Sequence, residues 1–178
     1  MEDSIHEDIA AGAMRYLVRV YDALRMWDSA LLMIRRYLER FPGADDVLQK
    51  RVQLATITMK LEDYSRAIEI LQDVQPDADP ETEAEIQYWI GKCHFSMGHF
   101  ETAAFEFLKV KYLSKSTRLP WDKTALYEAG LSFMRLREFA KAKDLFEKII
   151  EQEGATSDWG RVARQRIQEM ASGMTGAG

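Results

Sequence analysis

The chain of 178 residues is poor in cysteine, proline and glycine, and each shortage excludes a class of protein. Its single cysteine, Cys93, can form neither an intramolecular disulfide nor a four-cysteine zinc site. Four prolines and ten glycines are too few for a collagen-like or linker-rich chain. Because 47% of the residues are hydrophobic and 30% are charged, the composition favours a folded core over a disordered polar chain.

The sequence also lacks the marks of a leader peptide and of a membrane span. Residues 1–14 carry four acidic side chains and no lysine or arginine, whereas a secretory signal begins with a basic region. The apolar runs, such as residues 30–34, fall far short of the roughly 18 residues that a spanning helix needs. We therefore expect a soluble chain of the cytoplasm or periplasm, without membrane insertion. The net charge of −5 disfavours a general nucleic-acid binder.

The hydrophobic pattern predicts helices almost throughout. Apolar residues recur at spacings of three and four, and no stretch alternates with the period of two that is typical of a strand. Asp79 before Pro80 indicates a helix start, and so do Ser157 and the pair Ser4 and Glu7. The sequence therefore predicts an all-α fold, with breaks near Pro42, Pro76, Pro120 and Gly154.

Four aromatic residues recur at intervals of 37, 36 and 39 residues, each just after a short turn. An alanine lies three residues after each aromatic, and a large apolar residue lies four residues further on. A small or compact residue precedes each aromatic by nine positions. These series are Trp27, Tyr64, Phe100 and Phe139; Ala30, Ala67, Ala103 and Ala142; Ile34, Leu71, Phe107 and Phe146; and Val18, Ala55, Gly91 and Gly130.

The repeated pattern predicts four helix–turn–helix units that stack on one another. The small residues stand where two helices cross closely, and the large apolar residues form the buried stripe of the second helix. One such hairpin cannot bury its face alone, so neighbouring units must pack together. The alternative is an ordinary helical bundle in which the pattern arises by chance, and the four matching alanines argue against it.

These units resemble the tetratricopeptide repeat family. The match is clearest over residues 88–104 (YWIGKCHFSMGHFETAA) and over residues 126–142, where Gly91 and Gly130 stand at the small position of the first helix. The turn glycine of the family is present only as Gly98. The divergent, long units resemble those of bacterial envelope scaffolds more than those of eukaryotic co-chaperones.

The resemblance implies an α-solenoid of about four repeats within a single array over residues 1–172. The expected units span about residues 11–43, 48–79, 84–117 and 123–154, followed by a capping helix over 157–171 and a flexible tail over 173–178.

The resemblance also implies a concave groove that is lined by the first helix of each unit. Its residues are expected to be charged at the N-terminal end, and apolar and aromatic at the C-terminal half. They are Arg15, Arg19, Val52, Thr56, Met59, Tyr88, Lys92, Phe95, Tyr127, Leu131 and Met134, with Asp22 beside them. Tyrosine and methionine suit the capture of a protein segment. The alternative is that Tyr88, Phe95 and Tyr127 pack on one another or on the chain's own extra segment before the fourth repeat, residues 109–121.

The sequence offers little catalytic chemistry. It contains no phosphate-binding glycine loop, no HExxH and no GxSxG pattern. Cys93 and His94 could serve as a nucleophile with its base or, with His99, as metal ligands, but a buried core cysteine is the commoner situation. We therefore predict no enzyme activity, no cofactor and no metal.

Two further segments could contact partners. The first helix offers more apolar surface than one neighbouring helix would cover, in Ile5, Ile9, Met14, Leu17, Val18 and Tyr21. The basic residues 109–123 form either a docking segment or an ordinary solvated surface. We therefore predict an interaction module that binds an apolar or amphipathic protein segment in its groove. The alternative is an assembly domain that joins further repeats, or a second copy as a homodimer, through its N-terminal face.

Overall fold

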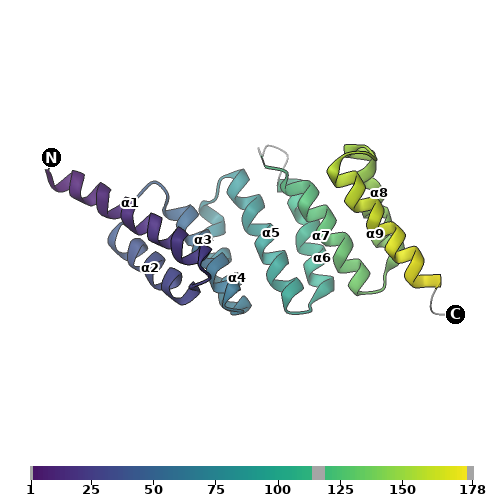
Figure 1. The fold of residues 1–178 in the computed structure, drawn as a ribbon, viewed down its shortest axis with the longest axis horizontal. Helices are drawn as coiled ribbons and strands as arrows, with labels where there is room; N and C mark the ends of the chain where they lie inside the picture. The colour runs from purple at the N-terminus through teal and green to yellow at the C-terminus, as the bar shows by residue number, and fades with distance from the viewer. Residues whose placement is uncertain (1, 114–118, 176–178) are drawn as a thin grey trace. The chain divides into compact units, whose positions relative to one another are not determined.

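The computed structural model describes residues 2–113 and 119–175, and this part of the chain is all-α (Figure 1). The described residues form nine α-helices and one short 3-10 helix, with no strand. The helices are α1 (Glu2–Ala23), α2 (Trp27–Arg40), α3 (Val47–Lys60), α4 (Tyr64–Val74), α5 (Pro80–Ser96), α6 (Phe100–Leu113), α7 (Trp121–Arg135), α8 (Phe139–Glu153) and α9 (Asp158–Thr175), and the 3-10 helix is η1 (Gln75–Asp77).

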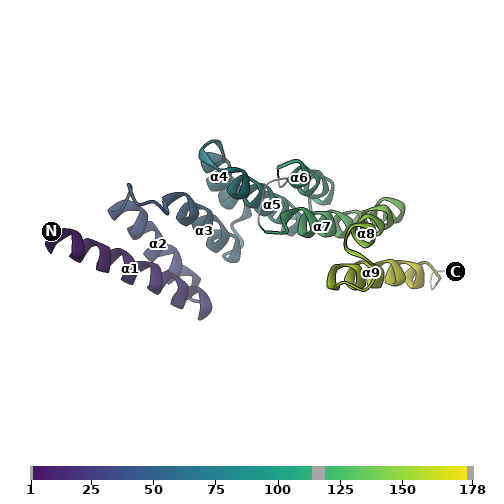
Figure 2. The same cartoon turned by 90° about the horizontal axis from the view of Figure 1, so that it is seen from above.

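The helices form two compact units, Met1–Ala78 and Asp79–Gly178. In unit 1, α1 packs on α2, α2 on α3 and α3 on α4. Figure 2 shows α1 at the edge of this unit, beside α2 and away from α4. In unit 2, helices α5 to α9 pack in succession, and α7 also contacts α5 and α9. Each unit is a stack of helix pairs. A single array over both units stays a prediction.

The repeated residues occupy equivalent places in the helix pairs. The four aromatics Trp27, Tyr64, Phe100 and Phe139 are the first residues of α2, α4, α6 and α8. The alanine three residues after each aromatic is fully buried, and so is the large apolar residue that follows it. The repeat pattern is therefore confirmed as a packing pattern and is not a coincidence of composition.

The glycines at the small position are required by close helix crossing. A Cβ atom on Gly91 would lie 2.7 Å from the ring of Phe107, and one on Gly130 would lie 2.7 Å from the ring of Phe146. Both distances are too short for carbon atoms that are not bonded. In each pair of unit 2, the ring of the second helix therefore fills the space left by the missing side chain of the first.

The expected helix starts are confirmed at Asp79 and Ser157 but not at Ser4. The Asp79 carboxylate accepts hydrogen bonds from the backbone N–H groups of Glu81 and Thr82, both at 2.9 Å, and Pro80 is the first residue of α5. The Ser157 hydroxyl accepts a hydrogen bond from the Gly160 N–H at 2.9 Å. Helix α1 begins at Glu2, so Ser4 lies within the helix.

Other boundaries also differ from the sequence-based expectation. Helix α1 begins at Glu2, well before the expected start of the first unit at about residue 11. Helix α9 ends at Thr175, so residues 173–175 continue the capping helix and are not part of a tail. Residues 176–178 of the expected tail lie outside the described residues, and so do residues 114–118 of the basic segment.

Candidate interaction surface

The groove residues expected in unit 1 do not form an apolar surface. Arg15 and Asp22 make ion pairs with residues of the α2–α3 turn and of α3: Arg15 Nη1 lies 3.5 Å from Asp46 Oδ2, and Lys60 Nζ lies 2.5 Å from Asp22 Oδ1. Arg19 is exposed. Val52 was expected in the groove but is only 3% exposed, and it belongs to the core.

The remaining two groove residues of unit 1 are half-buried on α3. The Thr56 hydroxyl donates its hydrogen to the Gln53 carbonyl oxygen at 2.9 Å, so it can only accept a hydrogen bond from a ligand. Met59 is half-buried one turn further along the helix. Unit 1 therefore offers isolated contacts but no continuous binding surface on these residues.

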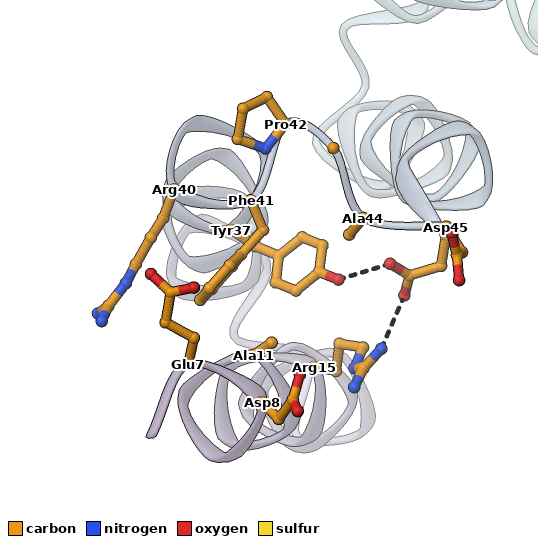
Figure 3. A pocket seen from close by; sticks show the side chains of 12 residues that line it. Glu7, Asp8, Ala11, Arg15, Tyr37, Arg40, Phe41, Pro42, Ala44 and Asp45 are labelled. Carbon is orange, nitrogen blue, oxygen red and sulfur yellow. Dashed lines mark hydrogen bonds and ion pairs between the residues drawn. The ribbon is translucent and has the colours of Figure 1, made fainter. Parts of the chain in front are cut away.

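Unit 1 instead has a polar hollow of about 510 Å³ beside α1 and the α2–α3 turn (Figure 3). The buried Tyr37 donates its hydroxyl hydrogen to Asp46 Oδ1 at 2.5 Å. Burial, and then the Asp46 carboxylate, raise the pKa of Tyr37. Half of the other lining residues are charged, among them Glu7 and Asp8 of α1. The Tyr37–Asp46 contact thus joins α2 to the turn and satisfies the buried hydroxyl.

In unit 2, the predicted groove residues lie on α5 and α7, which contact one another. Lys92 Nζ of α5 lies 3.0 Å from Glu128 Oε1 of α7, and the Glu128 side chain is only 13% exposed. Phe95, Leu131 and Met134 are half-buried hydrophobic residues at the edge of the core. These two helices therefore present a partly exposed apolar surface that is held together by an ion pair.

Tyr88 is a core residue, although it was expected to line the groove. It is 8% exposed, and its ring lies 5.7 Å from that of Phe107 and 5.4 Å from that of Trp121. Burial, and then the nearby Glu128 carboxylate, raise the pKa of Tyr88. Trp121 is the last residue of the extra segment 109–121 and the first residue of α7, so Tyr88 packs on the end of that segment, as the alternative expected.

Tyr127 is partly covered by the capping helix α9. Its ring lies 6.0 Å from that of Trp159 and 5.6 Å from that of Phe146. Arg166 donates a hydrogen bond from Nε to the Tyr127 hydroxyl at 2.8 Å, and its Nη1 lies 2.7 Å from Glu169 Oε2. The hydrogen bond from Arg166 lowers the pKa of the exposed Glu169. Tyr127 therefore contributes only an edge to the surface of α5 and α7.

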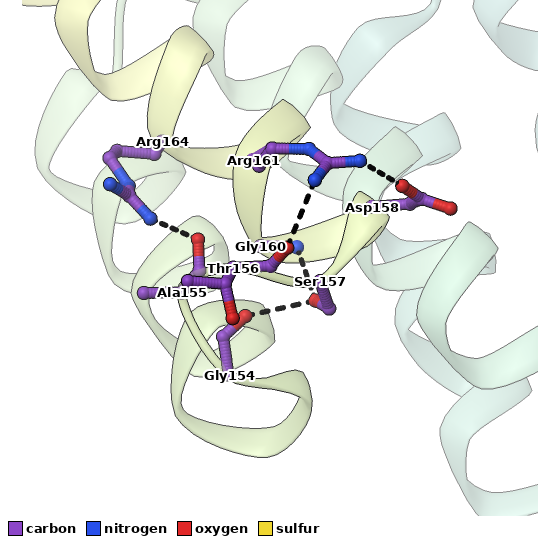
Figure 4. Close-up of polar contacts among 8 residues, drawn as sticks. All are labelled: Gly154, Ala155, Thr156, Ser157, Asp158, Gly160, Arg161 and Arg164. Atoms are coloured by element: carbon purple, nitrogen blue, oxygen red, sulfur yellow. Dashed lines mark hydrogen bonds and ion pairs between the residues drawn. The ribbon is translucent and has the colours of Figure 1, made fainter.

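The turn between α8 and α9 fixes the position of this capping helix (Figure 4). The Ser157 hydroxyl donates to the Gly154 carbonyl oxygen at 2.9 Å, and Arg164 donates to the Ala155 carbonyl oxygen. A Cβ atom on Gly160 would overlap the Gly154 carbonyl oxygen, so only glycine fits there. This compact turn places Trp159 and Arg166 over Tyr127.

Cations surround the exposed part of Phe95. Lys92 Nζ lies 5.6 Å from the centre of the Phe95 ring, and Arg135 Cζ lies 6.0 Å from it. Arg135 Cζ also lies 6.0 Å from the ring of Phe100, which packs edge-on against Phe95. These are cation–π distances. The surface thus combines apolar side chains with a basic rim.

Cys93, which was considered for catalysis, is a core residue, and the adjacent His94 is half-buried. Cys93 is fully buried, and burial raises the pKa of its thiol to about 12, whereas a cysteine nucleophile needs a lowered pKa. Burial also lowers the pKa of the adjacent His94, whose ring lies 6.0 Å from that of His99. Among the described residues, no three His, Cys, Asp or Glu side chains come together as a metal site would require.

Sequence reasoning did not single out Glu128, Arg135 and Arg166, although they shape the surface of unit 2. The repeat register offered a signal for two of them. Lys92 and Glu128 are 36 residues apart, and Tyr127 and Arg166 are 39 residues apart, so each pair is separated by one repeat period. Polar side chains one period apart on successive first helices come within reach of each other.

Comparison with known proteins places this arrangement in a family. Residues 84–117 and 124–153 match two models of the tetratricopeptide repeat. The chain contains tetratricopeptide repeats. The matched ranges coincide with the third and fourth helix–turn–helix repeats that the sequence predicts. No curated protein sequence matches the chain.

Solved structures with the same tetratricopeptide fold are similar over most of the chain. The nearly identical TPR-like repeats of a putative kinesin light chain from Podospora anserina have a TM-score of 0.75 at 13% identity, over 93% of this chain and 87% of that one. A tetratricopeptide repeat protein from Parabacteroides merdae has a TM-score of 0.67 at 16% identity, over 92% and 60%. At these identities the likeness shows the fold alone.

A third structure carries a functional description in its name. YrrB, described as a TPR protein with an unusual peptide-binding site, has a TM-score of 0.63 at 22% identity, over 88% of this chain and 75% of that one. The tetratricopeptide fold supports a role as a protein–protein interaction module.

In the part of the chain that the structure describes, no helix has the length and apolar character needed to cross a bilayer.

Proposed function

We propose that unit 2 is a non-enzymatic module that binds an apolar or amphipathic protein segment against α5 and α7. The observation that carries the proposal is the cluster of Phe95, Leu131 and Met134, which stay partly exposed on two adjacent first helices. Phenylalanine and methionine at a rigid helical surface are effective anchors for a partner chain. The family favours the same role, because its first helices line the binding groove.

The basic rim indicates what else the bound segment carries. Lys92 and Arg135 flank Phe95; Lys92 is already paired with Glu128, so the exposed Arg135 is the cation that faces a partner. A segment with apolar residues on one face and carboxylates beside them would satisfy both features. The net charge of −5 argues against nucleic acid as the ligand. The lysine and asparagine pattern with which the family clamps a chain-end carboxylate is absent from the groove positions, so an internal segment is the better fit.

To test the proposal, a random peptide library is displayed on phage, and the peptides that bind the immobilised whole chain are selected. Their affinities are then measured by fluorescence anisotropy for the wild type, Leu131→Asp and Met134→Asp. Loss of one apolar anchor should weaken binding at least about tenfold. Tyr88 is unsuitable for this test, because truncation of a buried ring would disturb folding.

Phe105→Asp is the matched control, because Phe105 is an exposed aromatic on α6, away from the proposed surface. It should leave the affinity unchanged. Circular dichroism and the unfolding midpoint establish that each variant is folded. The proposal fails if no peptide is selected, or if folded Leu131→Asp and Met134→Asp both bind the selected peptides as the wild type does.

A further inference from the structure

Helix α1 carries an exposed apolar stripe on the side opposite the core of unit 1. The helix packs on α2 through Val18, which is 1% exposed, so this residue is not available for the external face expected from the sequence. In contrast, Ile9 and Tyr16 are each 66% exposed, and Leu24, which directly follows the last residue of α1, is 64% exposed. Ala13 and Val20 lie between them at helical spacing, and both reach the surface. The stripe consists of Ile9, Ala13, Tyr16, Val20 and Leu24.

Gly12 beside the stripe has no packing role within the chain. A Cβ atom at Gly12 would meet nothing within 4 Å, in contrast to Gly91 and Gly130. A glycine in the middle of a helix lowers its stability relative to alanine. A neighbouring helix that approaches closely would give this small residue a function, because the distance between two helix axes depends on the side chains at the contact.

The charges along α1 favour a second copy of the same helix as that neighbour. The N-terminal part of α1 is acidic and its middle is basic, with Asp8 and Arg19 on the same edge of the stripe. Both are exposed, and neither makes an ion pair with another described residue. In an antiparallel pair related by a twofold axis, each edge faces the same edge of its partner, so Asp8 meets Arg19 of the other copy.

The apolar residues give almost the same register independently. An axis between Ala13 and Tyr16 places each alanine opposite the large ring of the other copy, and it places Ile9 opposite Val20. The midpoint of Asp8 and Arg19 differs from this centre by one residue, or about 1.5 Å along the helix. Small residues against large ones, with opposite charges beside them, are the pattern of a specific helix pair.

We propose that the chain forms a twofold symmetric homodimer in which two α1 helices pair antiparallel through this stripe. The hollow of about 530 Å³ next to the stripe, which Met14, Leu17 and Met33 line, extends the apolar surface towards α2. Residues at its rim, Arg36, Glu39 and Arg40, add further charges of both signs. This inference does not depend on the proposed peptide-binding surface, which lies in unit 2.

The test is sedimentation of the whole 178-residue chain over concentrations from about 1 to 200 µM. The wild type should shift from a mass of 20.6 kDa to twice that mass. Tyr16→Asp should weaken the dimer at least about tenfold, because it buries a charge at the centre. Phe105→Asp makes the same kind of change on α6 and should leave the dimer intact.

Charge exchange tests the antiparallel register. Asp8→Arg and Arg19→Asp should each weaken the dimer, because the partner then presents a like charge at both symmetric contacts. The double variant restores opposite charges and should recover an affinity close to that of the wild type.

The dimer proposal is overturned by a chain that stays monomeric at every concentration, or by a dimer that Tyr16→Asp does not affect. Failure of the double variant to recover overturns the antiparallel register.

Discussion

Four residues adopt the same left-handed backbone conformation at the turn inside each helix pair, although only one of them is glycine. The φ angles are 57° at Arg25, 63° at Glu62, 79° at Gly98 and 60° at Arg137. In each turn the following N–H donates back to the first helix, as from His99 to the His94 carbonyl oxygen at 2.9 Å. The turn geometry is therefore retained where the family's glycine is lost, at a cost in backbone strain.

Reciprocal substitutions at these turns test that cost. Gly98→Ala should lower the free energy of unfolding by about 1 kcal/mol, because a Cβ disfavours positive φ. Glu62→Gly should raise the free energy of unfolding, or leave it unchanged, despite the added flexibility of the unfolded chain. Urea unfolding followed by circular dichroism measures both. Equal destabilisation by the two variants would show that the turn conformation does not decide their stability.

At the scale of the helices, the sequence predicted where elements begin and which faces are buried. A strict spacing marked Trp27, Tyr64, Phe100 and Phe139 as equivalent, and each begins a second helix. This succeeded because the packing of a helix pair involves residues close in the chain. The sequence predicted less well which groove residues stay exposed. Tyr88 occupies a groove position of the family, but Trp121, at the end of the extra segment and the start of α7, covers its ring.

The exposure of Tyr127 was predicted poorly for the same reason, because another segment of the chain covers part of its ring. Its exposure depends on Trp159 and Arg166 of the capping helix α9, which lies outside the four expected repeats. Local spacing therefore identifies core residues reliably, whereas the residues that remain free for a partner depend on insertions and caps. The exposed stripe of α1 was missed in part for a related reason. The sequence did not distinguish the face with Val18, which packs on α2, from the opposite face with Ile9 and Tyr16.

The close crossing of α5 and α6 supports a prediction at this scale. Gly91→Ala should lower the free energy of unfolding by about 1–3 kcal/mol, because the new methyl group overlaps the buried ring of Phe107. Phe107→Leu alone should also destabilise the protein, through the space that it leaves. The double variant should lose less than the sum of the two, because the smaller side chain accommodates the methyl group. Additive losses in urea unfolding would contradict a direct contact.

At the scale of the whole molecule, the two units differ in their cores. The larger cluster extends from Ala84 to Met170 and lies entirely within unit 2. The cluster around α1 and α2 contains fewer buried residues, among them Val18 and Ile34. Repeat proteins derive their stability from each unit and from its neighbours, so a stretch with a complete core and a cap can fold alone. Unit 2 has a large hydrophobic cluster of its own and a cap, since Trp159 and Met170 of α9 close its last helix pair.

We therefore expect residues 79–178 to fold as an independent domain. The isolated fragment should show a helical circular dichroism spectrum and one cooperative urea transition, because the hydrophobic cluster from Ala84 to Met170 consists of its own residues. It should bind the selected peptides with the affinity of the whole chain and stay monomeric, since it retains the surface of α5 and α7 but lacks α1. A coil-like spectrum would contradict the independent core. A folded fragment that still dimerises would place the homodimer contact in unit 2 and away from the α1 stripe.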